Sequence, residues 1–222
     1  MEFTVTLRFG KGYIAHPYWP ERLKAIDIQK ESGMNRARSM EKRAATLQHY
    51  LQSLHPPMEF ADYELLCKLA DRQFYRFEDV PEELDGHNPK EIVIPAHHLY
   101  GCMANAADLA TSSIRLCSPE QVRTVLQVSS FATGKTECDD VWRRNVVVTS
   151  GTGGRLSNQR ALRENEFISH FEAKGTVSFS EHIVKPEKVY SFMEFAGRDV
   201  GVGASRKIGW GRFEISAWAA AK

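Results

Sequence analysis

The chain has 222 residues, of which 42% are hydrophobic and 26% charged, and its formal net charge is +1. This length allows one large domain or one core with a substantial insertion, and the near-neutral charge does not by itself indicate a polyanionic partner. No apolar run is long enough to cross a membrane. The four cysteines are widely spaced and form no C-x-x-C pair, which argues against a zinc ribbon or a disulfide framework. We therefore expect neither a metal nor a cofactor.

The N-terminal segment, residues 2–9, alternates apolar and polar residues and predicts a strand. It lacks the charged start and apolar block of a secretory signal, so we expect a cytoplasmic protein. An aromatic loop follows, and a helix is predicted from about residue 35 to residue 54. The early turns of this helix carry a dense basic cluster, which is either a solvated face or a binding surface. The cluster includes Arg36, Arg38 and Arg43.

The centre of the chain predicts a short second helix near Asp62, an acidic loop over residues 76–90 and a short strand over residues 92–94. An alanine-rich helix is expected over about residues 97–111, where small residues would allow close packing on a sheet. Pro119 begins another short helical segment that includes Leu126.

A basic hairpin is predicted next. Residues 141–149 are strand-like and lead into a glycine-rich turn, and five arginines but no acidic residue lie between positions 143 and 163. Because arginine stacks on bases and binds phosphates in a bidentate fashion, this hairpin is a candidate nucleic-acid contact. A solvated loop with incidental arginines is the alternative. The candidate residues are Arg143, Arg155, Arg160 and Arg163.

The C-terminal region predicts a long strand over residues 167–179 that bends near Gly175, a helix over residues 186–196 and a final strand from residue 213. Without the inserted regions, the order is strand, helix, strand, strand, helix, strand. This order is typical of the split β-α-β arrangement. We therefore expect an α+β fold with a ferredoxin-like, RNA-recognition-motif-like core: an antiparallel sheet and two helices, carrying helical and hairpin insertions.

A glycine-rich loop, residues 201–212, precedes the final strand and combines closely spaced glycines with three cations and a tryptophan. Glycines permit close approach of the backbone, and successive N–H groups can form an anion-binding concavity. The cations and the indole would suit a ligand with phosphates and bases. A glycine-rich hairpin before an edge strand is the alternative. The candidate residues are Gly201, Gly203, Ser205, Arg206, Lys207, Gly209, Trp210 and Arg212.

Two familiar nucleotide-binding motifs are rejected. The Gly201-x-Gly203 pair resembles the start of a dinucleotide fingerprint, but that motif follows a strand and opens a helix, whereas here a helix precedes and a strand follows. The segment Thr133–Thr136 resembles the end of a phosphate-binding loop, but Ser129 stands where that motif requires its first glycine.

The stretch Ile94–Gly101 resembles the I-P-x-S-S-L-K-G entry to the first core helix in the RAMP superfamily of CRISPR-associated proteins. His97 and His98 replace the usual small hydroxyl pair, and Tyr100 replaces the frequent lysine. The glycine-rich loop resembles the loop before the final strand of that family. The resemblance implies a single RAMP-like domain over residues 1–222. It also implies a fingers-like helical insertion over about residues 28–75 and a thumb-like hairpin insertion over about residues 130–165.

This resemblance is closest to backbone subunits that hold guide RNA in multisubunit effector complexes of antiviral defence, or to a relative in a phage or mobile element. It implies a non-catalytic role: sequence-independent binding of single-stranded RNA, with His97 and His98 among the contacts. Other effector subunits and head-to-tail copies of the chain would be its partners. Single-stranded DNA or a target strand remain alternative ligands.

Two other functions stay open at this point. One is an endoribonuclease that uses His97 or His98 as general base, or Asp27 as a loop aspartate in metal-dependent cleavage. The other is a phage-encoded structural or interaction protein that reuses the fold.

Overall fold

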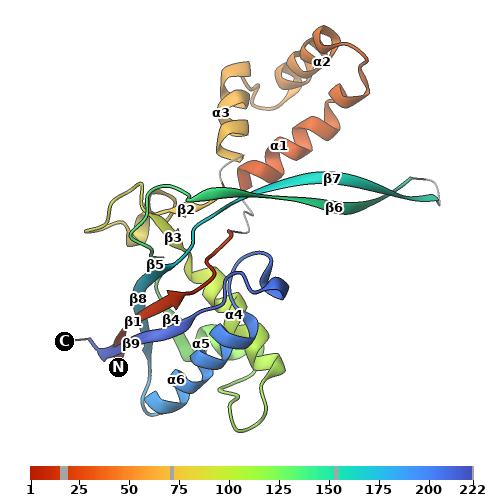
Figure 1. Cartoon of the computed structure of the whole chain (residues 1–222). Coiled ribbons are helices and arrows are strands. Elements are labelled where there is room, and N and C mark those ends of the chain that lie inside the picture. The colour runs from red at the N-terminus through yellow and green to blue at the C-terminus, as the bar shows by residue number, and fades with distance from the viewer. Residues whose placement is uncertain (16–19, 71–72, 153–154, 222) are drawn as a thin grey trace. The chain divides into compact units, whose positions relative to one another are not determined.

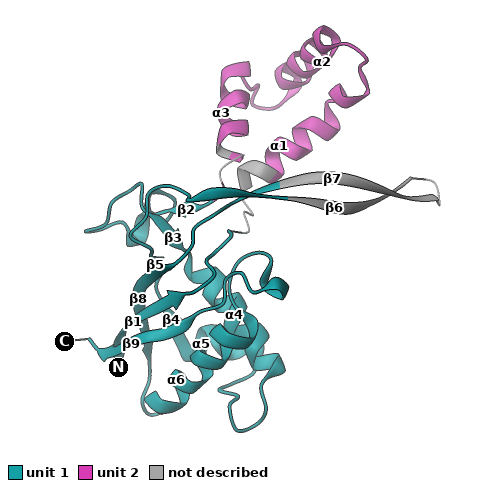
Figure 2. Cartoon of the chain, viewed as in Figure 1, with its two compact units in different colours: residues 1–16, 74–222 teal, residues 17–73 magenta. Residues whose placement is uncertain are grey.

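The computed structural model describes residues 1–15, 20–70, 73–152 and 155–221, without the side chains of residues 20–22, 69 and 144–163. These residues form two compact units (Figure 2). Unit 1 comprises residues 1–16 and 74–222, and unit 2 comprises residues 17–73.

Unit 1 is built on an antiparallel sheet with two helices on one face (Figure 1). Its core order along the chain is β1, α4, β4, β8, α6, β9, and the spatial order of the strands is β9-β1-β8-β4 with every neighbouring pair antiparallel. This is the β-α-β-β-α-β arrangement of ferredoxin-like folds. The predicted α+β class is therefore confirmed. The bounds are β1 Glu2–Phe9, α4 Ala96–Leu109, β4 Leu126–Val128, β8 Phe171–Phe179, α6 Pro186–Phe195 and β9 Glu214–Ala220.

Apolar residues alternate with polar ones along the strands and recur at helical spacing along α4 and α6. Both patterns place apolar side chains at the interface between the sheet and the helices, where they form the core. On β1, Val5 and Leu7 are fully buried, whereas Thr4 and Arg8 face solvent. Apolar side chains of α4 and α6 pack on these strand residues, and together they form one continuous hydrophobic core. Those helix residues are Leu99, Cys102, Met103, Ala106, Val189, Phe192 and Met193.

Three short strands extend the sheet beyond β8, and they are β2 (Tyr75–Arg76), β3 (Ile92–Ile94) and β5 (Phe131–Ala132). The strand predicted over residues 92–94 is confirmed as β3. Short helical turns complete this part of the unit at Phe77–Asp79, Pro81–Glu83 and Pro119–Gln121, and α5 spans Val122–Val125. Leu126 was expected in that last helix but begins β4 instead.

The predicted strand over residues 167–179 is wrong in one respect. Gly175 does not mark a bend, because it pairs within β8 and a Cβ atom there would lie 2.5 Å from the Phe131 ring. The break lies at residues 168–170, where His170 has a φ of 46°. There the chain passes from β7 (Arg155–Phe167) into β8. Glycine at position 175 therefore makes room for the Phe131 ring and does not bend the strand.

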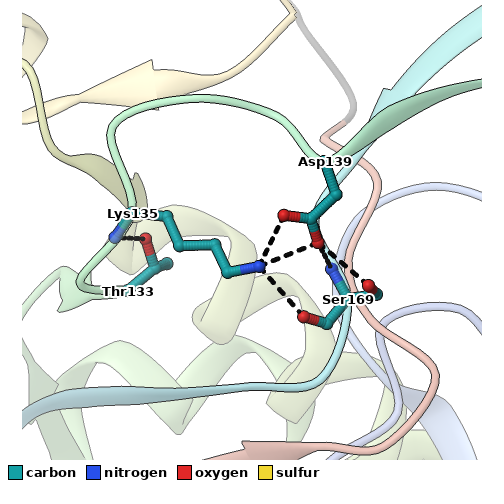
Figure 3. A network of polar contacts seen from close by, with 4 residues as sticks. All are labelled: Thr133, Lys135, Asp139 and Ser169. Atoms are coloured by element: carbon teal, nitrogen blue, oxygen red, sulfur yellow. Dashed lines mark hydrogen bonds and ion pairs between the residues drawn. The ribbon is translucent and has the colours of Figure 1, made fainter.

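The strands β6 (Asp140–Thr152) and β7 pair antiparallel as a separate two-stranded sheet. A polar network fixes the base of this hairpin (Figure 3). Lys135 Nζ donates to both carboxylate oxygens of Asp139, at 2.6 and 2.8 Å, and to the Ser169 carbonyl at 3.1 Å. Asp139 also accepts hydrogen bonds from the Ser169 N–H at 2.6 Å and hydroxyl at 2.9 Å. The lysine of the rejected phosphate-loop segment thus has a structural role.

Unit 2 consists of α1 (Pro20–Glu31), α2 (Met40–Ser53) and α3 (Phe60–Ala70), with a 3-10 turn at Met34–Arg36. Its small core contains Ile28, Leu47, Leu51 and Tyr63.

The predicted helix over residues 35–54 starts later than expected. The Ser39 hydroxyl accepts a hydrogen bond from the Lys42 N–H at 3.3 Å and so caps α2. Arg36 and Arg38 therefore precede the helix. The helix α1 was not predicted, because its apolar residues do not gather on one face of the sequence pattern. Asp27 lies in α1, so its expected position in a loop is wrong.

We predict that Asp139→Asn destabilises unit 1 by about 1 kcal/mol at pH 7, because it removes one partner of a charge-assisted network that is partly exposed. Partial burial alone would raise the pKa of Asp139, but Lys135 and Ser169 lower it overall. A lowered folded-state pKa stabilises the fold above the unfolded pKa, and this contribution is lost as the pH falls through the folded value. The difference between the two proteins in urea unfolding should therefore be smaller at pH 3 than at pH 7. An equal difference at both pH values would contradict the assignment.

Candidate nucleic-acid interface

The sheet face turned away from α4 and α6 carries polar side chains. Arg8 of β1 lies opposite Glu172 of β8 and pairs with it at 3.2 Å, and Thr4 and Lys174 are exposed on the same strands. The aromatic residues of β1 and β8 in the described chain all lie on the buried face. RNA-recognition motifs stack bases on aromatic rings of the open sheet face. The two central strands do not offer that binding mode.

The entry to α4 is organised by a buried tyrosine. Tyr13 lies in the loop after β1, is fully buried, and its hydroxyl is 2.7 Å from Nδ1 of His98. Burial, reinforced by Tyr75, raises the pKa of Tyr13 well above its usual value, so the hydroxyl keeps its proton. A neutral His98 that accepts this hydrogen bond at Nδ1 carries its own proton on Nε2.

His97 faces a pocket of about 310 Å³ whose lining includes Tyr75, Arg123 and Glu83. Its ring lies 5.2 Å from the Tyr75 ring in an edge-on arrangement. Partial burial, helped by the positive charge of Arg123, lowers the pKa of His97. His97 is therefore neutral near pH 7 and adds no positive charge to this pocket. Sequence reasoning missed Arg123, which lies on a short helix without a recognisable motif.

The glycine-rich loop closes on the same tyrosine. Gly203 has a φ of 72°, and a Cβ atom there would lie 2.3 Å from the Ile14 carbonyl oxygen and 2.6 Å from the Tyr13 ring. The Ala204 N–H donates to that Ile14 carbonyl at 2.8 Å. Tyr13 thus brings together the two segments that carried the family resemblance, the α4 entry and the glycine-rich loop.

Several backbone N–H groups of the loop are already used inside the protein. Gly201 donates to Ala196 at 2.8 Å, and Gly211 donates to Gly12 at 2.7 Å. Gly209 donates to Arg206 at 3.0 Å. These three N–H groups do not form the anion-binding concavity that the sequence suggested. The glycines instead let loop segments approach one another, since a Cβ atom at Gly211 would overlap the Val202 carbonyl.

The cations of the loop lie on a second pocket. Arg206, Lys207 and Arg212 line a cavity of about 290 Å³ together with Asn105 and Asp108 of α4. Arg212 also donates a hydrogen bond to the Arg198 carbonyl. The three predicted loop cations are therefore gathered at one place.

Trp210 does not match the base-stacking role expected from the sequence. It is only 7% exposed, and its ring lies 5.0 Å from Phe167 and 5.9 Å from Trp142. Lys11 Nζ lies 5.3 Å from the ring centre and donates to the Ile208 carbonyl at 2.7 Å. Trp210 thus attaches the loop to the base of the hairpin.

The predicted arginines of the hairpin are described only in part. Arg143 is 70% exposed and pairs with Glu164 at 2.8 Å. This glutamate lies just outside the arginine-rich stretch but directly opposite Arg143 in the hairpin. Pairing across the strands therefore offsets a charge that looked isolated in the sequence. The side chains of Arg155, Arg160 and Arg163 lie outside the described residues.

The remaining predicted residues lie in unit 2. Arg36, Arg38 and Arg43 are exposed there, and Arg43 Nε donates to the Ala37 carbonyl at 3.0 Å. Arg43 also borders an apolar cavity of about 500 Å³, on whose edge Met40 is 84% exposed.

Asp27 is exposed on α1, and the described residues contain no group of three or more His, Cys, Asp or Glu side chains that could hold a metal. In the described ranges, no helix is both long and apolar enough to span a membrane.

No protein-family model matches the chain, and no curated protein matches it. Among solved structures, it is similar to a chain of the cryo-EM structure of the type III-B Cmr-beta bound to cognate target RNA, with 11% sequence identity and a TM-score of 0.46. That match covers 100% of this chain and 60% of the other, so this chain spans about 60% of the length of that relative. A second similar structure is Cmr6 from Pyrococcus furiosus, with 12% identity, a TM-score of 0.34 and coverage of 97% and 98%.

We predict that Gly203→Ala destabilises unit 1 far more than Gly86→Ala does. Both glycines have positive φ, 72° and 76°, so both substitutions cost about 1–2 kcal/mol in backbone strain. Only Gly203 also meets other atoms, since nothing lies within 4 Å of a Cβ atom at Gly86. Thermal unfolding measures the difference. Equal losses of stability in the two variants would show that the loop does not depend on its contact with Tyr13.

Proposed function

We propose that the chain binds single-stranded RNA as a guide-RNA-holding subunit of a CRISPR-type ribonucleoprotein effector and belongs to the RAMP superfamily. The observation that carries this proposal is the meeting of the α4 entry and the glycine-rich loop at Tyr13. These are the two segments whose sequences resemble that family. The ferredoxin-like order of the core strands and helices also supports membership of the RAMP superfamily.

The chemistry of this region favours contacts to the RNA backbone. Arg206, Lys207 and Arg212 gather on one pocket and would neutralise phosphates, the main source of sequence-independent affinity. The open face of the two central strands lacks rings on which bases could stack, and Trp210 is covered. Bases bound by such a surface would stay free to pair with another strand.

The proposal includes repeated head-to-tail binding of copies along one RNA, next to other effector subunits. The hairpin arginines and the exposed Arg36, Arg38 and Arg43 would add contacts to RNA. The apolar cavity of unit 2, with Met40 and Phe60 exposed at its edge, favours a protein contact there. Complexes should then grow in mass with the length of the RNA.

We predict that Arg206→Ala weakens binding of labelled single-stranded RNA about fivefold to tenfold and reduces the slope of log K against log salt by about 0.7, the change for one lost phosphate contact on a single strand. The control Lys174→Ala removes the same charge from the open sheet face, where we expect no RNA. Fluorescence anisotropy across a salt titration measures both effects. Wild-type protein that does not bind RNA at low salt, or a larger loss for Lys174→Ala, would contradict the proposal.

A second candidate function is an endoribonuclease, favoured by the pocket at His97. With its lowered pKa, this histidine is neutral near pH 7 and could take the proton of an RNA 2′-hydroxyl. The oxygen would attack the adjacent phosphorus, the bond to the 5′-oxygen would break, and a 2′,3′-cyclic phosphate would remain. Arg123 would offset the charge on the phosphate. His98 suits the role of general base less well, because Tyr13 occupies its Nδ1.

We predict that RNA incubated with the wild-type protein stays intact, because the proposed role of the chain is to hold the strand and not to cleave it. Denaturing gels and analysis of the RNA ends measure this. Shortened RNA with cyclic phosphate ends that disappears in His97→Ala, but persists in the control His49→Ala in unit 2, would establish the nuclease instead.

A further inference from the structure

The pocket beside the C-terminal half of α4 combines three kinds of chemistry. Arg206, Lys207 and Arg212 supply positive charge from the glycine-rich loop. On the α4 side, Asp108 supplies a carboxylate and Leu109 an apolar side chain that is 66% exposed. Cations alone would suit a bare phosphate, so the carboxylate beside them needs a further explanation.

The carboxylate of Asp108 makes no hydrogen bond or ion pair with any residue that the structure describes, although three cations line the same pocket. Arg115 reaches only the backbone carbonyl of Asp108, at 3.4 Å. The other aspartate of the pocket, Asp199, accepts a hydrogen bond from Arg198 at 3.0 Å. Both side-chain oxygens of Asp108 therefore remain available as acceptors.

A free carboxylate repels phosphate and weakens a site that binds phosphate alone. It strengthens the site if the ligand also brings a hydroxyl donor, because a carboxylate only accepts hydrogen bonds. Asn105, one turn before Asp108, donates its amide N–H to the Gly101 carbonyl at 2.9 Å, which leaves its amide oxygen as a second acceptor. The helix side of the pocket thus offers acceptors, and the loop side offers cations.

A ribose with its phosphate matches this arrangement. Carboxylates recognise ribose hydroxyls in dinucleotide-binding proteins, and the 2′-hydroxyl is the group by which proteins distinguish RNA from DNA. The volume, about 290 Å³, is at the lower end for small-ligand sites and suits one nucleotide unit.

We propose that this pocket holds one ribose–phosphate unit of the bound strand, with Asp108 accepting a hydrogen bond from the 2′-hydroxyl. The chain then selects RNA over DNA. This inference rests on the proposed function, because it concerns the strand that the loop cations bind. In DNA the hydroxyl donor is missing, and the carboxylate faces the phosphate without a compensating hydrogen bond.

The test compares three uridine oligonucleotides of about 30 nucleotides, a length that spans several binding sites of this kind. One is RNA, one contains 2′-deoxyuridine, and one carries 2′-fluorine, which keeps the sugar pucker of RNA but removes the donor. Fluorescence anisotropy with the full chain gives the affinity for each. We expect RNA to bind about tenfold more tightly than either of the others, the loss expected for one hydrogen bond to a charged group.

The variant Asp108→Ala should bring the three affinities to within about twofold of one another. Removal of the negative charge should strengthen the binding of all three strands equally. The ratio of the affinities therefore reports the contribution of the 2′-hydroxyl alone. Asp108→Asn keeps a neutral acceptor and should retain part of the preference. The control Asp85→Ala removes an exposed carboxylate from a loop of unit 1, away from α4, and should keep the wild-type ratio.

The outcomes separate this inference from the function on which it rests. Wild-type protein that binds RNA and DNA equally, or a preference that Asp108→Ala leaves unchanged, overturns the role of Asp108 while RNA binding stands. Tight binding of the 2′-fluoro strand also overturns it. Failure to bind any of the three strands overturns both proposals.

Discussion

The buried side chain of Tyr13 is the contact on which the candidate interface depends. Its ring lies only 2.6 Å from where a Cβ atom at position 203 would be, and its hydroxyl lies 2.7 Å from Nδ1 of His98 at the start of α4. Its backbone pairs with Ile168, the residue that follows β7, through hydrogen bonds of 2.8 and 3.1 Å. One residue in a loop after the first strand thus holds the α4 entry, the glycine-rich loop and the end of the hairpin in fixed positions.

This constraint decides which groups are left for a ligand. The loop uses several of its N–H groups and its tryptophan to pack against the rest of unit 1, so these groups stabilise the protein itself. Charged side chains remain at the edge of the packed region, where Arg206, Lys207 and Arg212 meet the flank of α4. The proposed RNA contact therefore relies on side chains at the rim of a closely packed loop, and not on the backbone N–H groups of that loop or on its tryptophan.

Two groups of contacts hold the base of the hairpin. Lys135, Asp139 and Ser169 form one charged network, and Trp210 packs against Trp142 and Phe167 in a second group of contacts. Trp210 belongs to the loop that carries the cations, so the aromatic contacts join that loop to the hairpin. The orientation of the two strands where they leave the core is therefore fixed by side chains from four separate segments.

The sequence by itself determined the elements whose signal is local. Alternation gave β1, helical spacing gave α4 and α6, and the glycines marked the loop before β9, because each pattern reflects the geometry of neighbouring residues along the chain. The tertiary structure alone decided what distant segments do to one another. The tertiary contacts bury Trp210, place Glu164 opposite Arg143, satisfy several N–H groups of the loop and set Asp108 beside three cations. Strand pairing and the packing of loops around Tyr13 create these neighbours, and no local pattern records which residues will meet.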